Sequence, residues 1–370
     1  MPDPAHADTL ARRVAGFGLP GSDHRPWSVP DDVWPSLLAG LAAQRITGLA
    51  VAGAEAGWLV MSDPQAEELL SRHRDAMLWA LTLERRLLGL AAEFRAAGID
   101  HVVLKGPAVA HSFYPDPSWR GFGDLDLLVK TADWRAACRL LEDLGFRREL
   151  PEPRPGFDER FGKAATHRGG DGCEIDLHRT LVLGPFGLWI DPDELFERTV
   201  EFRLGGESLR RLEDTVAFLH ACVHASLGWW PPLLTPVRDV AQVANRGAVD
   251  WTDAADLAGR WRLGVVVRHA LKLASEQLGV EIPDPAQAIV ATRPRRRETR
   301  LLEAYASDRR RRGGTALSTL HAIPGLRGKA AYIWQLVFPA REFLVARTGS
   351  GSPSYARRWK VALRWLTWRR

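Results

Sequence analysis

Apolar side chains recur at helical spacing over most of the first hundred residues. Leu37, Leu38 and Leu41 share one helical face, and leucines recur in the same way between 78 and 90, so the pattern predicts helices across residues 31–96. Gly98 follows the second run, at the position where a helix C-terminus favours glycine. The N-terminal part of the chain is therefore predicted to be helical.

The spacing of apolar residues changes at His101. The run HVVLK is short, rich in β-branched residues and followed by Gly106 and Pro107, which predicts a buried strand that turns into a short helix. The same signals then predict a strand, a helix and a strand pair, at 124–129, 131–144, and 161–168 with 173–180. This order of elements predicts an α+β fold built on a small mixed sheet.

Helical periodicity returns at Leu212 and continues to the C-terminus. Four helix-sized runs separated by Pro, Gly and Asp predict an all-helical region, and two further helices are predicted on either side of the flexible segment GSGSPS. The chain is thus predicted to contain an N-terminal helical region, a mixed core, a helical domain and a basic helical tail, with boundaries at 1–96, 97–208, 209–292 and 293–370.

The composition is that of a globular protein, because 46% of the 370 residues are hydrophobic and 26% are charged. Three cysteines without a CxxC pair supply neither a disulfide framework nor a structural zinc site. The N-terminus carries acidic residues where a signal peptide carries basic ones, and no apolar run approaches the roughly 20 residues that span a bilayer. We therefore expect a cytoplasmic protein with no transmembrane segment.

The net charge of +5 hides a strong asymmetry along the chain. Residues 293–370 contain 19 Arg and Lys against 4 Asp and Glu, whereas the first 292 residues contain 31 against 41. The positive charge of this tail predicts an anionic partner. The candidates are nucleic acid, an anionic membrane surface and the acidic body of the same chain. The apolar stretch 332–346 favours docking on the body, while the Arg- and Trp-rich stretch 357–368 is typical of a basic amphipathic helix.

Acidic residues on two predicted strands carry the strongest chemical signal. Asp124 and Asp126 are two residues apart, so both carboxylates share one face of a strand. In CEIDLH, Glu174, Asp176 and His178 share a face in the same way. Carboxylates at this density need a cation, and oxygen ligands suit Mg²⁺ (or Mn²⁺). We predict that the three aspartates form a metal site, with His178 on the acceptor side of a reaction.

A predicted strand-to-helix turn fits a phosphate group. Lys105-Gly106 ends one strand and opens a helix, where backbone N–H groups can approach a phosphate, although Pro107 has no N–H to donate. Arg120, four residues before Asp124, is a further candidate cation for phosphate oxygens. These residues predict a phosphate-binding region next to the acidic cluster.

Two histidines, His220 and His224, are four residues apart on a predicted helix, at a spacing that allows them to share a metal. No glutamate accompanies them as in an HExxH motif, and apolar residues flank both. We interpret them as packing or hydrogen-bonding residues beneath the site.

Together these motifs resemble the bacterial uncharacterised nucleotidyltransferase family, within the polymerase-β-like nucleotidyltransferase superfamily. The resemblance covers about residues 75–270 and rests on LKGPAVAHSFYPDPSWRGFGDLDLLV, EIDLH, LHACVH and RDVAQV. It implies a small mixed-sheet nucleotidyltransferase core in which Gly106 forms the phosphate turn, Asp124 and Asp126 bind metal, and Asp176 is the third carboxylate. Many members of the superfamily have Gly-Gly or Gly-Ser at the turn, where this chain has Lys105-Gly106 followed by proline.

The resemblance implies Mg²⁺-dependent transfer of an NMP from an NTP, with ATP among the candidates, to a hydroxyl or phosphate acceptor, with release of pyrophosphate. Lys105, Gly106 and Arg120 would bind the triphosphate. The acceptor stays open among a small molecule, a peptide or protein side chain, and an RNA end.

The alternative function is a non-catalytic scaffold of the same fold that binds RNA or membrane through its basic tail. The intact acidic trio argues against it, because carboxylates that repel one another without a metal have no reason to persist in an inactive site. The same repulsion predicts that Asp126→Ala leaves the fold intact or more stable.

Overall fold

The computed structural model describes residues 4–291, 293–305, 314–349, 355 and 359. The strands in these residues are β1 (Trp27–Ser28), β2 (Leu59–Val60), β3 (His101–Val103), β4 (Leu125–Val129), β5 (Arg147–Arg148), β6 (Ala164–Arg168), β7 (Glu174–His178), β8 (Thr199–Leu204) and β9 (Glu207–Leu212). The helices are α1 (Pro4–Gly16), α2 (Trp34–Ala43), α3 (Thr47–Glu55), α4 (Asp63–Ala96), α5 (Pro107–Phe113), α6 (Trp134–Asp143), α7 (Phe157–Phe161), α8 (Pro185–Trp189), α9 (Pro192–Glu197), α10 (Asp214–Leu227), α11 (Leu234–Arg246), α12 (Trp251–Arg260), α13 (Gly264–Leu278), α14 (Asp284–Ala291), α15 (Arg296–Tyr305), α16 (Gly314–Ala322), α17 (Leu326–Val337) and α18 (Arg341–Thr348).

Seven strands form one mixed sheet in the order β5-β6-β7-β4-β3-β9-β8. At its centre β4 runs parallel to β7 and antiparallel to β3, and β3 runs parallel to β9. The α+β class expected from the sequence is confirmed, and so are the four predicted strands and the helical run that follows them. The hairpin of β8 and β9 was not predicted, and the helix expected at 131–144 begins with a 3-10 turn, Thr131–Asp133, before α6.

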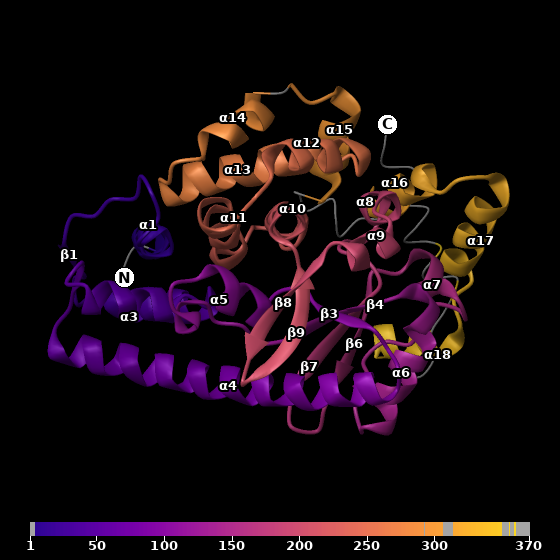
Figure 1. Ribbon diagram of the computed structural model, residues 1–370, viewed down its shortest axis with the longest axis horizontal. Helices are drawn as coiled ribbons and strands as arrows, with labels where there is room; N and C mark the ends of the chain where they lie inside the picture. Colours follow the sequence, from indigo (N-terminus) through magenta and orange to yellow (C-terminus); the bar gives the residue numbers. More distant parts are fainter. Residues whose placement is uncertain (1–3, 292, 306–313, 350–354, 356–358, 360–370) are drawn as a thin grey trace.

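The two faces of the sheet are covered by different helices (Figure 1). The 34-residue helix α4 crosses one face, where its Leu83 and Leu87 pack with Leu125 and Leu127 of β4. Helices α10 to α13 lie over the other face, and Leu128 of β4 belongs to their hydrophobic cluster. Because side chains alternate along a strand, Asp126 shares the face of Leu128 and lies on the α10 side of the sheet.

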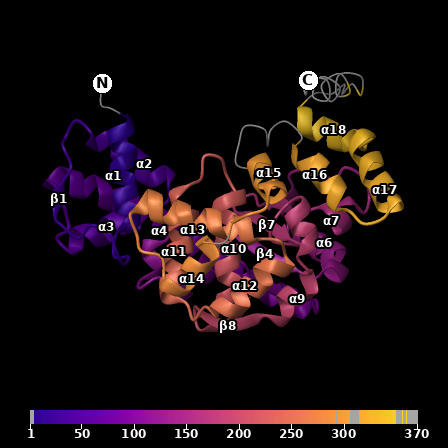
Figure 2. The ribbon, with the colours of Figure 1, turned by 90° about the horizontal axis from the view of Figure 1, so that it is seen from above.

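Helices α15 to α18 gather at one end of the molecule and α1 to α3 at the other (Figure 2). Tyr332 of α17 packs on Phe157 and Phe161 of α7, with ring centroids 6.1 Å and 5.1 Å apart, so this part of the basic tail is docked on the body. The predicted amphipathic helix at 357–368 lies outside the described residues except for Trp359. Among the helices that the structure describes, none is both long enough and apolar enough to cross a membrane.

Candidate active site

The parallel pairing of β4 with β7 places two aspartates side by side. Asp126 is the register partner of Asp176. Thr166 on the neighbouring strand β6 donates a hydrogen bond from Oγ1 to Oδ1 of Asp176 at 2.6 Å, which fixes the orientation of that carboxylate. His178, two residues further along β7, places its Nε2 2.9 Å from Oδ1 of Asp126. One ligand atom each from Asp126, Asp176 and His178 lies within 4.8 Å of the others.

Lys105 lies between the two aspartates of the DLD motif. Its Nζ is 2.6 Å from Oδ2 of Asp126 and 3.6 Å from Oδ2 of Asp124. Burial alone would lower the pKa of Lys105, but the attraction of both carboxylates outweighs it and raises that pKa. Burial likewise opposes ionisation of Asp126, yet Lys105 and the hydrogen bond from His178 hold the pKa of Asp126 well below its usual range. The acidic cluster, which consists of Asp124, Asp126, Asp176 and His178, therefore has Lys105 as a counter-charge.

The surroundings of His178 fit a cation next to Asp126. Its Nδ1 lies 3.2 Å from the carbonyl oxygen of Thr180, and its Nε2 faces a carboxylate oxygen, so both ring nitrogens face acceptors. A neutral imidazole has one N–H, and therefore one of these contacts needs either a second proton or a cation. Oδ2 of Asp126 is buried and lies in an ion pair with Lys105, 2.6 Å from Nζ, without hydrogen-bond geometry. Two carboxylates and an imidazole are a donor set that suits Mn²⁺ as well as Mg²⁺.

The turn at Gly106 is held from behind by a buried ion pair. Gly106 has a backbone φ of +59°, which residues other than glycine rarely adopt, and it leads directly into α5. Arg120 donates from Nη1 to the carbonyl oxygen of Gly106 at 3.3 Å and from Nε and Nη2 to the two carboxylate oxygens of Asp239 at 2.8 Å and 2.7 Å. Tyr114 donates to the same carboxylate at 2.8 Å. Arg120 and Asp239 are both buried, so the guanidinium lies behind the turn.

The acidic cluster becomes more exposed from Asp126 toward Arg45. The side chain of Asp126 is 1% exposed, that of Asp124 is 24% exposed, and that of Arg45 is 50% exposed. Nη1 of Arg45 lies 3.3 Å from Oδ1 of Asp124. The same guanidinium packs on Gly123, where an added Cβ would lie 2.7 Å from Nη2. The cluster therefore opens to solvent on the side of Arg45.

Helix α10 contributes two histidines that face the cluster. His220 is buried, and burial, followed by the nearby charges of His178 and Lys105, lowers its pKa to about 3. Burial and then Lys105 also lower the pKa of His224, which is half-buried. Both imidazoles are therefore neutral at pH 7 and available as hydrogen-bonding groups beside the acids.

We expect His220 to make the fold sensitive to acid. Its pKa is about 3 in the folded chain and about 6.5 in an unfolded one, so between these values only the unfolded state binds the proton and stability falls as the pH decreases. His220→Gln should remove about 2 kcal/mol of the stability loss between pH 7 and pH 5, measured by urea unfolding. His24→Gln, at an exposed imidazole, is the control. Equal pH slopes for native chain and His220→Gln would contradict this role.

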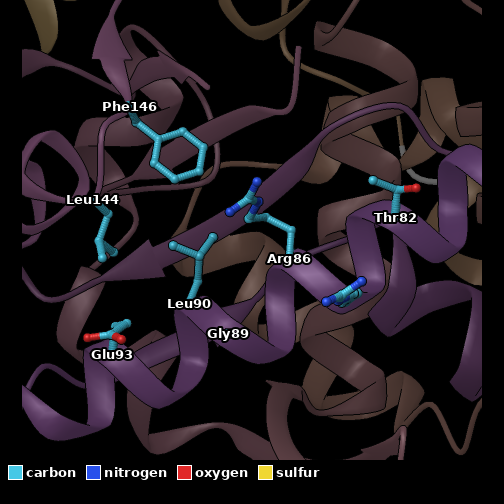
Figure 3. A pocket seen from close by; sticks show the side chains of 8 residues that line it. Thr82, Arg86, Gly89, Leu90, Glu93, Leu144 and Phe146 are labelled. Atoms are coloured by element: carbon cyan, nitrogen blue, oxygen red, sulfur yellow. The ribbon is translucent and has the colours of Figure 1, made fainter. Parts of the chain in front are cut away.

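A pocket of about 450 Å³ lies away from the acids, on the α4 side of the sheet (Figure 3). Its lining includes Arg86, Leu90 and Phe146, and the Arg86 guanidinium lies 5.7 Å from the centroid of the Phe146 ring. Leu90 and Phe146 belong to the hydrophobic cluster beneath the opposite face of β4. This pocket is therefore separated from the acidic cluster by the sheet.

Several residues of the cluster carried no signal in the sequence. Arg45 lies far upstream between two helices, and Thr166 occurs in a strand without a motif. Lys163, just before β6, affects the pKa values of His220 and His224 and so lies near the cluster as well. Only the period-two alternation of β6 could have placed Thr166 on the same face as Asp176.

Comparison with known proteins identifies the family. Residues 30–279 match the family described as uncharacterised nucleotidyltransferase, in agreement with the resemblance carried by the sequence motifs. No curated protein matches the chain.

Two solved structures show distant similarity. Lincomycin-bound lincosamide antibiotic adenylyltransferase LnuA is 13% identical, with 36% of this chain and 83% of that chain covered and a TM-score of 0.28. An antigenic nucleotidyltransferase-like protein from Paracoccidioides brasiliensis is 17% identical, with 55% and 95% covered and a TM-score of 0.32. Because the family match spans more than half of its residues, the chain belongs to the uncharacterised nucleotidyltransferase family.

Proposed function

We propose that the chain transfers an NMP from an NTP to a hydroxyl or phosphate group of an acceptor, with Mg²⁺ or Mn²⁺ as cofactor and pyrophosphate as the second product. The observation that carries this proposal is the cluster of Asp126, Asp176 and His178 on two paired strands, beside a lysine at the Gly106 turn. Membership of a nucleotidyltransferase family supports the same reaction class.

Asp124, Asp126 and Asp176 would hold the metal, with Asp126 at the centre because it is the carboxylate nearest to both Lys105 and His178. A divalent cation bound there would neutralise phosphate charge and polarise the reacting phosphate. With metal bound, Nδ1 of His178 would donate to the carbonyl oxygen of Thr180 and Nε2 would be directed at the metal site.

The reaction forms one P–O bond and breaks another. An acceptor oxygen attacks the α-phosphorus of the NTP, and the bond from that phosphorus to the oxygen bridging the β-phosphate breaks, so pyrophosphate leaves with the electron pair. Asp176 accepts the proton of the acceptor and is oriented for this role by Thr166. Lys105 and the backbone at Gly106 would face the triphosphate.

Arg120 would act by supporting the turn at Gly106. Its guanidinium is buried against Asp239 and also donates to the carbonyl oxygen of Gly106, so it would hold the backbone of the turn in place for the phosphates. Arg45, at the open side of the cluster, is the exposed cation on the path of the triphosphate.

The proposed function is tested by a screen of the four NTPs with Mg²⁺ or Mn²⁺, scored by pyrophosphate release with small-molecule, peptide and RNA acceptors. We expect release that depends on the metal and is lost in Asp176→Asn. The matched control is Asp171→Asn, since Asp171 lies in the turn before β7 and pairs with Arg86 instead of the cluster. Turnover that persists in Asp176→Asn would refute the assigned site.

We expect an NTP to raise the melting temperature only together with a divalent cation. The three carboxylates outnumber Lys105 and Arg45, so the cluster keeps a negative charge that repels the triphosphate until a divalent cation is bound. A ligand that binds only the folded state then stabilises it. The measurement is thermal unfolding with ATP plus Mg²⁺ and with ATP plus EDTA. Equal stabilisation in EDTA would show that the nucleotide binds elsewhere.

A further inference from the structure

The loop between α10 and α11, residues 228–233, presents two adjacent tryptophans to solvent. Trp229 is 64% exposed and Trp230 is 46% exposed. Large aromatic side chains are ordinarily mostly buried, so neighbouring exposed indoles form an apolar patch that costs solvation energy unless a ligand covers it. Pro231 and Pro232 follow directly and restrict the backbone of the loop. Hydrogen bonds at both ends of the loop fix its position relative to the acidic cluster.

The first end of the loop is fixed to a histidine of the candidate active site. The N–H of Gly228 donates to the carbonyl oxygen of His224 at 3.0 Å, and an added Cβ at Gly228 would lie 2.3 Å from that oxygen. The imidazole of His224 is close enough to Lys105 and Asp126 for their charges to affect its pKa. Trp229 therefore directly follows Gly228, which lies about 6 Å along the helix axis beyond a histidine near the cluster.

The second end of the loop is fixed to the open side of the cluster. The N–H of Leu234 donates to Oε1 of Gln44 at 2.7 Å, and the hydroxyl of Thr235 donates to the carbonyl oxygen of Gln44. Gln44 directly precedes Arg45, whose guanidinium contacts Asp124. A ligand whose charged end lies at the cluster can extend past Arg45, because exposure increases from Asp126 through Asp124 to Arg45. The tryptophan loop borders that path.

We propose that Trp229 and Trp230 form a stacking platform for the nucleobase of the NTP. This inference rests on the proposed function, which places the triphosphate at Lys105 and the Gly106 turn. An NTP combines a strongly anionic end with a planar aromatic end. The structure offers a metal-suited acidic cluster flanked by Lys105 and Arg45, and an exposed aromatic pair on a loop fixed to the residue before Arg45. Stacking on indoles accepts any base, since every base presents a π-face.

The test compares a ligand that has a base with one that lacks it. Calorimetric titration of the full chain, with Mg²⁺ present, measures the affinity for α,β-methylene-ATP, which resists cleavage at the α-phosphorus, and for inorganic tripolyphosphate. We expect the double variant Trp229→Ala/Trp230→Ala to bind the nucleotide about 5- to 150-fold more weakly, the loss expected for one stacked base, and tripolyphosphate with unchanged affinity. Trp229→Phe/Trp230→Phe should retain most of the nucleotide affinity. Trp334→Ala, at an exposed indole of α17, is the matched control and should change neither value.

Two results would overturn the platform and leave the proposed function standing. Unchanged nucleotide affinity in the alanine variant would show that the tryptophans serve another ligand, such as the acceptor. An equal loss for nucleotide and tripolyphosphate would show that the loop only supports the phosphate site. If the native chain bound neither ligand with Mg²⁺, the proposed function itself would fail, and the platform with it.

Discussion

Asp126→Ala should abolish nucleotidyl transfer and also destabilise the fold. Asp126 contacts both Lys105 and His178, so we expect turnover to fall more than about 100-fold, beyond the 10- to 100-fold loss typical of residues that only orient metal ligands. The variant leaves the buried ammonium of Lys105 with only the more distant Asp124. Breaking a buried ion pair in this way costs about 3–5 kcal/mol, which urea unfolding measures directly.

A second substitution separates the two effects of Asp126→Ala. Lys105→Met in the same chain removes the unpaired charge, so the double variant should regain much of the lost stability while turnover stays absent. Repulsion among bare carboxylates, as considered from the sequence alone, predicts the opposite sign for the single variant. Unchanged or higher stability of Asp126→Ala would therefore show that Lys105 does not compensate the acids.

Arg120→Ala should strongly destabilise the chain. The change leaves the carboxylate of Asp239 buried with only Tyr114 as a hydrogen-bond donor, and an unpaired buried charge costs about 3–5 kcal/mol. It also removes the donor to the carbonyl oxygen of Gly106, so the affinity for tripolyphosphate should fall as the turn loosens. Urea unfolding and calorimetric titration measure the two effects.

The control for Arg120→Ala is an ion pair of similar geometry at the surface. Arg135 pairs with Glu159 through two hydrogen bonds, but its side chain is largely exposed, so Arg135→Ala should cost no more than about 1 kcal/mol. The double variant Arg120→Met/Asp239→Leu, which removes both buried charges, should be more stable than Arg120→Ala. If Arg120→Ala instead lowered only nucleotide affinity at full stability, the guanidinium would contact phosphate directly.

The fold was predictable where a single period of side chains dominates. The helices at 31–96 and after Leu212 and the strands around Asp124 and Asp176 all follow from apolar spacing and from the glycines that end them. The β8–β9 hairpin was missed because its strands alternate few apolar residues with arginine and glutamate. Gly205-Gly206 at its turn, both with positive φ, was the signal that could have revealed it.

The candidate site was predictable only as far as its motifs reach. The alternation of side chains along a strand predicted that Asp124 and Asp126 share a face, and that Asp176 and His178 do. The contacts between the two strands depend on the order of strands in the sheet, which the sequence did not reveal. The pairing of Arg120 with Asp239 joins residues 119 positions apart, and no local pattern links them. The burial of Lys105 between the acids also depends on packing. The sequence therefore predicted that Lys105 contacts phosphate, but not that it pairs with Asp126.

The parallel pairing of β4 with β7 affects the order in which the sheet folds. The hairpins β6–β7 and β8–β9 join neighbouring segments, whereas α6, β5, α7 and β6 lie between β4 and β7 in the chain. Loop-closure entropy favours the local hairpins first and the distant parallel pair later. During synthesis Asp124 and Asp126 therefore emerge well before their partner strand exists. A nascent or partly unfolded chain lacks the paired carboxylates, so the candidate site forms late in folding, only once β4 and β7 have paired.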